Sequence, residues 1–173
     1  NSGGPCATTT DQTITINAAG DATFNYAITS FCSNATNPIP TVAAPGGTFS
    51  SAPAGLIFVS TATGEINLAL SNPGSYTITY NSGGLCPVTQ TQDITIIQST
   101  NSFFTYSSTT YCTNATSNPS PLITLPGGTF TSSPAGLVFV NTFTGEINLS
   151  ASAANTYTIT YTSTGTCSTT TTQ

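Results

Sequence analysis

The stretch Tyr76-Thr77-Ile78-Thr79-Tyr80 indicates the fold class of this chain, because bulky apolar side chains alternate with threonine along it. A period of two predicts a half-buried β-strand, with one face on a core and the other in water. The same five residues return at positions 157–161, so the chain carries this strand twice. Signals for helices are nearly missing.

Other stretches of the first copy alternate in the same way, at 24–28, 65–70 and 93–96. The apolar run at 56–59 predicts a strand covered on both sides or a corner. Proline and glycine clusters separate these stretches at regular intervals, so we predict an all-β fold of immunoglobulin-like antiparallel β-sandwiches. The side chains expected to face the core are Phe24, Tyr26, Ile28, Ile66, Leu68, Leu70, Ile94 and Ile96.

The whole unit is repeated. Residues 24–86 return as residues 104–167 with one residue inserted at Ser117, and 38 of the 63 aligned positions are identical. A period of 80 to 81 residues fits a small tandem domain and is too long for one turn of a solenoid. We therefore expect residues 19–98 to form one repeat and residues 99–173 a second, joined by a short polar connection into a stiff rod.

The repeat also runs past both ends of these units. Residues 6–16 match residues 86–96, so residues 1–18 correspond to the last strand of a preceding repeat, whereas the second repeat stops before a counterpart of residues 93–96. Either the sequence is a window of a longer repeat protein, which the extra Cys6 favours, or the N-terminal strand of one molecule completes the second repeat of a neighbour by strand addition. The residues that would be donated are Asp11, Gln12, Thr13, Ile14, Thr15 and Ile16.

The composition excludes several classes of function. Lys, Arg and His are absent and five acidic residues give a formal net charge of −5, so the chain has no basic patch for nucleic acid. We expect no enzyme activity and no cofactor, because the usual bases and electrophiles are missing and the carboxylates form no paired motif. No metal site is expected without His or closely spaced cysteines. No apolar stretch reaches the ~20 residues of a membrane helix, so we expect no membrane insertion.

The five cysteines recur with the repeat and predict structural disulfides in an oxidising compartment. Pairing within each unit, Cys32–Cys86 and Cys112–Cys167, would leave Cys6 to a partner outside the chain. Each such bridge would stabilise its unit by ~4 kcal/mol if chain entropy alone is counted. The alternative, Cys6–Cys32 with Cys86–Cys112, would join neighbouring units and leave Cys167 without a partner in this chain.

Several short elements carry a resemblance to a known class of repeats. The stretches Pro53-Ala54-Gly55-Leu56 and Thr63-Gly64-Glu65-Ile66, followed by the strand that ends at Tyr80, resemble the core of immunoglobulin-like and cadherin-like repeats of bacterial surface proteins. The aromatic opening that ends at Cys32 and the Pro45-Gly46-Gly47-Thr48-Phe49 element are similar to repeats of large Bacteroidota adhesins and gliding-associated proteins. The resemblance implies an extracellular, structural or adhesive role and offers no catalytic residues.

The surface offers candidate modification sites. Asn34, Asn114 and Asn148 each begin an Asn-x-Ser/Thr sequence and could carry N-linked sugar, which would hydrate a surface with few charges. The favoured hypothesis is a structural extracellular rod, filament or adhesin stalk whose partners are other copies of the chain. The alternative is an adhesin module that binds carbohydrate through its loops or exposed aromatic rings.

Overall fold

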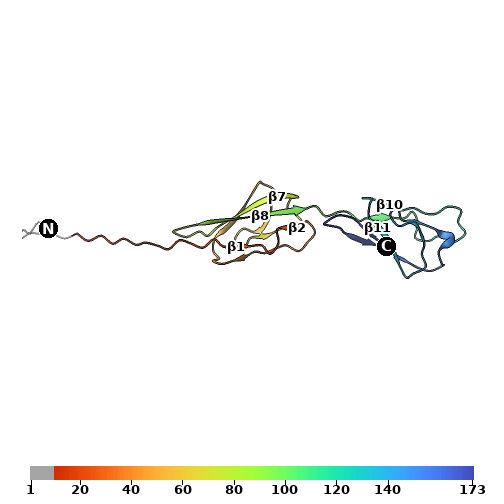
Figure 1. Cartoon of the computed structure of the whole chain (residues 1–173), viewed down its shortest axis with the longest axis horizontal. Helices are drawn as coiled ribbons and strands as arrows, with labels where there is room; N and C mark the ends of the chain where they lie inside the picture. Colours follow the sequence, from red (N-terminus) through yellow and green to blue (C-terminus); the bar gives the residue numbers. More distant parts are fainter. Residues whose placement is uncertain (1–9) are drawn as a thin grey trace, which may run out of the picture.

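A computed structural model of the chain describes residues 10–173, so Cys6 lies outside the described residues. The secondary structure of the described part is β-strand apart from one 3₁₀ turn, which confirms the all-β prediction. Figure 1 shows an elongated molecule in which an N-terminal segment, a first unit and a second unit follow one another. We call strands β1 to β8 unit 1 and strands β9 to β15 unit 2.

Unit 1 is a small β-sandwich. One layer is a sheet with the strand order β2-β8-β7-β4, and the antiparallel pairs β1–β3 and β5–β6 form the other layer. Rings from both layers meet between them, for example Phe24 of β1 and Phe49 of β4 at 5.2 Å. The strands are β1 (Phe24–Asn25), β2 (Ser30–Cys32), β3 (Thr41–Val42), β4 (Thr48–Ala52), β5 (Phe58–Ser60), β6 (Glu65–Ile66), β7 (Gly74–Asn81) and β8 (Thr89–Ile97).

Antiparallel pairings dominate as predicted, but β2 and β8 run in parallel. Cys32, at the C-terminal end of β2, therefore lies opposite Ile97, where the chain leaves unit 1. This pairing decides which end of the unit the first cysteine occupies.

The period-two pattern correctly predicted the centre of the unit 1 core. Tyr76, Ile78 and Tyr80 of β7 are at most 4% exposed, and so are Ile94 and Ile96 of β8. Burying an isoleucine side chain contributes roughly 1.5–3 kcal/mol to stability, so β8 supplies a substantial part of this small core. β8 lies between β2 and β7, so it both forms hydrogen bonds with these strands and contributes buried side chains to the core.

Some expectations about single side chains are wrong. Ile28 and Leu70 are 57% and 69% exposed, because neither position lies in a strand. The apolar run that begins at Leu56 is not covered on both sides: Leu56 is buried, whereas Ile57 and Val59 are 43% and 52% exposed. This run follows the ordinary alternation of a one-sided strand.

Unit 2 repeats the architecture with a smaller main sheet of order β11-β14-β15 and the antiparallel pairs β9–β10 and β12–β13. Its strand β14 has 5 residues where β7 has 8, and β15 has 3 where β8 has 9. The elements are β9 (Phe104–Thr105), β10 (Leu122–Ile123), β11 (Thr129–Ser133), β12 (Phe139–Asn141), β13 (Glu146–Ile147), the 3₁₀ turn η1 (Leu149–Ala151), β14 (Thr158–Thr162) and β15 (Thr170–Thr172).

Both units share one aromatic centre. The Tyr80 hydroxyl donates to the Ala44 carbonyl at 2.7 Å and accepts from the Gly47 N–H at 2.9 Å, and Tyr161 makes the equivalent bonds in unit 2. A side chain at position 47 would overlap the Asn81 carbonyl oxygen, so the strand pair requires glycine there. The two units therefore have the same fold on this side and differ on the side of β8.

Candidate functional site, an open strand groove in unit 2

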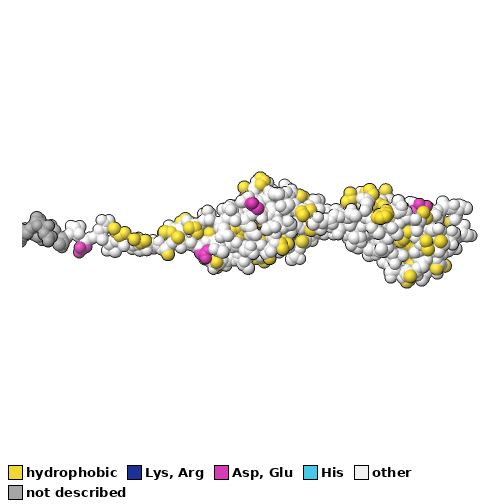
Figure 2. Space-filling model, in the orientation of Figure 1, with side chains coloured by type: hydrophobic (Ala, Val, Ile, Leu, Met, Phe, Trp, Pro, Cys, Tyr) yellow, Lys and Arg dark blue, Asp and Glu magenta, His cyan; other side chains and the backbone are white. Residues whose placement is uncertain are grey.

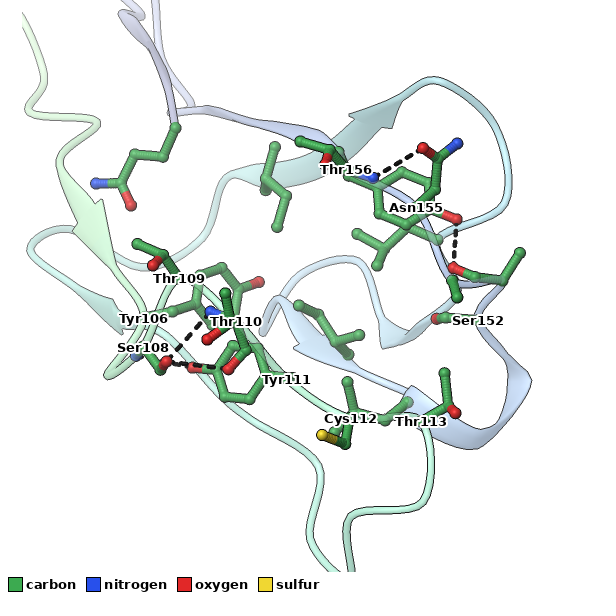
Figure 3. A pocket seen from close by; sticks show the side chains of 18 of the residues that line it. Tyr106, Ser108, Thr109, Thr110, Tyr111, Cys112, Thr113, Ser152, Asn155 and Thr156 are labelled. Carbon is green, nitrogen blue, oxygen red and sulfur yellow. Dashed lines mark hydrogen bonds between the residues drawn. The ribbon is translucent and has the colours of Figure 1, made fainter.

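A groove with a cavity volume of about 760 Å³ opens in unit 2. Residues 105–114 and residues 152–157 form its walls and lie on opposite sides of it in Figure 3. Ile159 and Gln173 also line it, and the lining includes no Asp or Glu side chain. We call this cavity the unit 2 groove.

The apolar lining of the unit 2 groove corresponds to the core of unit 1. Phe31 is 7% exposed in unit 1, whereas its counterpart Tyr111 is 37% exposed. The alignment of the repeats could have identified these receiving residues, although sequence reasoning named only the donor ones. The matching residues of unit 1 are buried Tyr26, Phe31, Leu56, Ile66, Leu68, Tyr76 and Ile78, and those of unit 2 are Tyr106, Tyr111, Leu137, Ile147, Leu149, Tyr157 and Ile159.

In unit 1 the corresponding space is filled by the second half of β8. Ile94 lies opposite Tyr76 across the antiparallel pair, and Ile96 lies opposite Phe31 across the parallel pair. These two isoleucines are 2% and 1% exposed. The groove thus has the shape and polarity that an Ile-x-Ile strand fills in the neighbouring copy of the same fold.

The pairing of Gln173 with Ile159 shows where such a strand would enter. Gln173 exchanges backbone hydrogen bonds with Ile159 at 2.7 and 2.9 Å, as Gln92 pairs with Ile78 in unit 1. Its side-chain amide donates to the Phe104 carbonyl. Beyond this pair, residues 155–157 and residues 110–112 form no strand, whereas their counterparts in unit 1 lie on either side of β8 and pair with it.

The candidate donor lies at the other end of the molecule. Residues 10–20 extend from unit 1 and form no strand in this chain (Figure 1), and every one of them is exposed. Ile14 and Ile16 are 77% and 93% exposed, and Figure 2 shows hydrophobic side chains along this segment. In the repeat alignment they are the counterparts of Ile94 and Ile96.

The segment enters unit 1 as the inter-unit connection enters unit 2. The Gly20 N–H donates to the Cys86 carbonyl at 2.9 Å, and the equivalent Thr100 N–H donates to the Cys167 carbonyl at 3.1 Å. The C-terminal end of the segment therefore contacts unit 1 in the same way as the inter-unit connection contacts unit 2. Residues 11–16 project beyond unit 1.

The ionisable side chains that line the groove are three phenols and the Cys112 thiol. Burial raises the pKa of Tyr106 above its ordinary value, and the nearby Tyr111 adds to this shift. The Tyr106 hydroxyl donates to the Gly145 carbonyl. Tyr106 is therefore neutral at physiological pH and adds no charge that would oppose the entry of an apolar strand.

The structure corrects the predicted disulfides. Cys32 is bonded to Cys167, with 5.4 Å between the Cα atoms, so the bridge joins unit 1 to unit 2 and neither within-unit pair forms. Cys86 lies at the opposite end of unit 1 from Cys32, because its Sγ is 3.8 Å from the carbonyl of Asn17, where the chain enters the unit. The alternative pairing is wrong as well, since Cys86 and Cys112 are both free thiols in the structure.

The three candidate glycosylation sites lie in different surroundings. The Asn34 side chain accepts from the Ser99 hydroxyl at 2.5 Å, beside the connection between the units, while Asn114 is exposed. Asn148 caps η1, where its side chain accepts from the Ala151 N–H at 3.1 Å. Glycosylation stays a prediction.

Among residues 10–173, no group of three or more His, Cys, Asp or Glu side chains could hold a metal ion. No helix in this part of the chain is long and apolar enough to cross a membrane.

No family model matches the chain, and no curated protein matches it. Among solved structures, the chain is similar to a crystal structure of mouse cadherin-23, repeats EC22-24, with 12% sequence identity and a TM-score of 0.33. The match covers 88% of this chain, and the chain spans 64% of the cadherin-23 chain in that structure.

Proposed function

We propose that this chain is a structural subunit of an extracellular filament, in which residues 13–16 of one copy enter the unit 2 groove of the next, directly beyond the place that Gln173 holds. The observation that carries the proposal is the correspondence between donor and groove. The groove is lined by counterparts of the residues that surround Ile94 and Ile96, and the exposed segment has isoleucines in the matching positions, Ile14 and Ile16.

The register follows from unit 1. Ile14 would lie opposite Tyr157, as Ile94 lies opposite Tyr76, and Ile16 would lie beside Tyr111, as Ile96 lies beside Phe31. Thr13 and Thr15 would then face outward, in the places of Asp93 and Thr95, because successive side chains of a strand point to opposite faces.

The stabilisation would come from two sources. Moving Ile14 and Ile16 from water into the groove is worth about 3–6 kcal/mol in total. Backbone hydrogen bonds would form on both sides of the donated strand, antiparallel to residues 155–157 and parallel to residues 110–112, as β8 pairs with β7 and β2. Insertion would also order the edge of unit 2 and complete its four-stranded sheet.

The cellular setting rests on the same features. A disulfide between two units is typical of an oxidising compartment and supports an extracellular location. Tandem sandwiches linked through a short connection suit a rod or stalk, in which length and stiffness are the function. Carbohydrate binding stays a prediction for the loops.

A matched pair of single-charge variants tests the proposal. Ile14→Asp would bury a carboxylate in the groove, and we expect it to abolish filaments seen by negative-stain electron microscopy and by sedimentation. Thr13→Asp adds the same charge on the outward face, where Asp93 already stands in β8, and should assemble like the parent. Circular dichroism should show both variants folded.

Each outcome of this test has a defined meaning. Filaments that form equally with Ile14→Asp would contradict strand donation. A parent chain that remains monomeric at all concentrations would contradict the filament as well, and would favour an array within one longer polypeptide.

A further inference from the structure

We propose that successive copies in the filament become covalently joined by a disulfide between Cys86 of the donating copy and Cys112 of the receiving copy. This inference rests on the proposed strand donation and adds a chemical bond to it. Both thiols are free in the structure, with Cys112 exposed and Cys86 partly buried.

The first argument is the repeat itself. The bridge Cys32–Cys167 joins the first cysteine of one unit to the second cysteine of the unit that follows. Cys112 is the counterpart of Cys32, and Cys86 is the counterpart of Cys167. When unit 1 of a second copy follows unit 2 of the first, the same rule pairs Cys112 with Cys86.

The second argument is the local geometry at each end. Within the chain, Cys32 lies opposite Ile97 in the parallel pair, and its sulfur reaches Cys167 of the following unit. Asn17 is the counterpart of Ile97, and the Cys86 sulfur is already 3.8 Å from its carbonyl oxygen. A donated strand that seats Ile16 beside Tyr111 places Asn17 beside Cys112, and Cys86 arrives with it.

The third argument is the matching entry of the chain into each unit. Residues 17–20 approach Cys86 as residues 97–100 approach Cys167, with equivalent Gly20 and Thr100 hydrogen bonds. The junction between one copy and the next can therefore have the same arrangement as the junction between unit 1 and unit 2. One interaction is not repeated: Ser99, which bonds to Ser33 and Asn34, is replaced by Ala19.

Cys86 and Cys112 of the same molecule cannot form a disulfide with each other. Cys86 lies where the N-terminal segment enters unit 1, and Cys112 occupies in unit 2 the place that Cys32 has at the exit of unit 1. Figure 3 shows Cys112 at the edge of the unit 2 groove, beside Tyr111 and Thr113. A bond between Cys86 and Cys112 is consequently a bond between copies.

The chemistry needs an oxidant, which we take to be a small-molecule disulfide such as oxidised glutathione. A cysteine thiolate attacks the small disulfide and releases one thiol, and the second cysteine then displaces the other. The protein loses two protons and two electrons overall, one S–S bond forms between the copies, and one S–S bond of the small molecule becomes two thiols. The Cys32–Cys167 bridge requires the same oxidation.

The test mixes ¹⁴N- and ¹⁵N-labelled protein in a Cys6→Ser background, assembles filaments with a glutathione redox buffer, and digests them with chymotrypsin, because trypsin has no cleavage site. We expect a linked pair of peptides that contain Cys86 and Cys112, about half of them carrying both isotopes. Boiled, non-reducing gels should show a ladder of covalent multimers. Cys86→Ser, a change outside the unit 2 groove, should abolish the ladder while filaments still form, and Cys112→Ser should abolish the ladder as well.

The two proposals fail in different ways. Filaments that dissolve to monomers on the non-reducing gel, without the linked peptide, would overturn the covalent bond and leave strand donation standing. A linked peptide with only one isotope per molecule would also overturn it. The absence of filaments in the parent and in both serine variants would instead contradict the proposed function.

Discussion

The sulfur of Cys32 is bonded to that of Cys167, 135 residues further along the chain, so a covalent bond closes the junction between unit 1 and unit 2. Hydrogen bonds between Ser33 and Ser99 lie at the same junction. The two units are therefore connected through the backbone, through side chains and through a disulfide, which favours a stiff step between them.

Replacing Cys32 by serine should lower the free energy of unfolding, because the bridge restricts the unfolded chain over a long loop. The chain-entropy relation gives up to about 5 kcal/mol for a loop of more than 100 residues. Denaturant unfolding of the monomer measures the difference. Cys112→Ser changes an exposed thiol and should stay within about 0.5 kcal/mol of the parent; an equal loss in both variants would contradict the structural role of the bridge.

The isoleucine at the centre of each main sheet offers a matched comparison. Ile78 is completely buried, and Ile78→Ala should cost about 2–5 kcal/mol of stability. Ile159, its counterpart, is only half-buried at the edge of the unit 2 groove, so Ile159→Ala should cost less in the monomer. In filaments, where a donated strand would cover Ile159, the stability lost through Ile159→Ala should approach the stability lost through Ile78→Ala. Unfolding measured separately on monomers and on filaments checks this. A difference between the two losses that is the same in filaments as in monomers would contradict insertion beside Ile159.

The hydroxyl of Tyr80 is predicted to stabilise unit 1. Tyr80→Phe would leave the buried Gly47 N–H without its acceptor, which should cost about 1–3 kcal/mol. Tyr157→Phe removes a hydroxyl that donates to the Ala153 carbonyl at an exposed site, so its cost should be smaller. Thermal unfolding of the two variants checks the order, and a larger loss for Tyr157→Phe would contradict it.

Stability should fall in alkali because of two buried phenols. Burial raises the pKa of Tyr26 and of Tyr106 above the ordinary value, so the folded chain retains protons that the unfolded chain releases above about pH 10. The stabilisation is complete below that pH and declines as the pH rises further. Unfolding experiments from pH 8 to 12 measure it. Tyr26→Phe should flatten the decline, and an unchanged slope would contradict the assignment.

Much of the fold could be predicted from the alternation of side chains, because burial on one face of a strand selects apolar residues at every second position. This holds for the residues of β7 and for Ile94 and Ile96. The prediction fails at Ile28 and Leu70, which lie outside the strands. An apolar residue there does not have to face the core.

The cysteine pairing could not be predicted from spacing. Both candidate pairings fit the repeat period equally well, and the choice depends on which end of a unit each cysteine occupies. That is decided by the parallel pairing of β2 with β8, which places Cys32 beside Ile97 at the exit of unit 1. The period-two pattern of the sequence does not indicate whether two short strands pair in parallel or antiparallel.

The donor residues, by contrast, could be predicted from the alignment of the repeats, because Ile14 and Ile16 align with Ile94 and Ile96. The same alignment identifies the receiving residues, but only the structure shows that Tyr111 is uncovered while Phe31 is buried.

The most direct measurement is calorimetric titration of the Ile14→Asp chain, which keeps an intact groove, with a synthetic peptide of residues 10–20. We predict saturable binding of one peptide per chain, and no binding of the same peptide carrying aspartate at position 14. A wild-type peptide that does not bind, or that binds no better than the aspartate peptide, would contradict strand donation into the unit 2 groove.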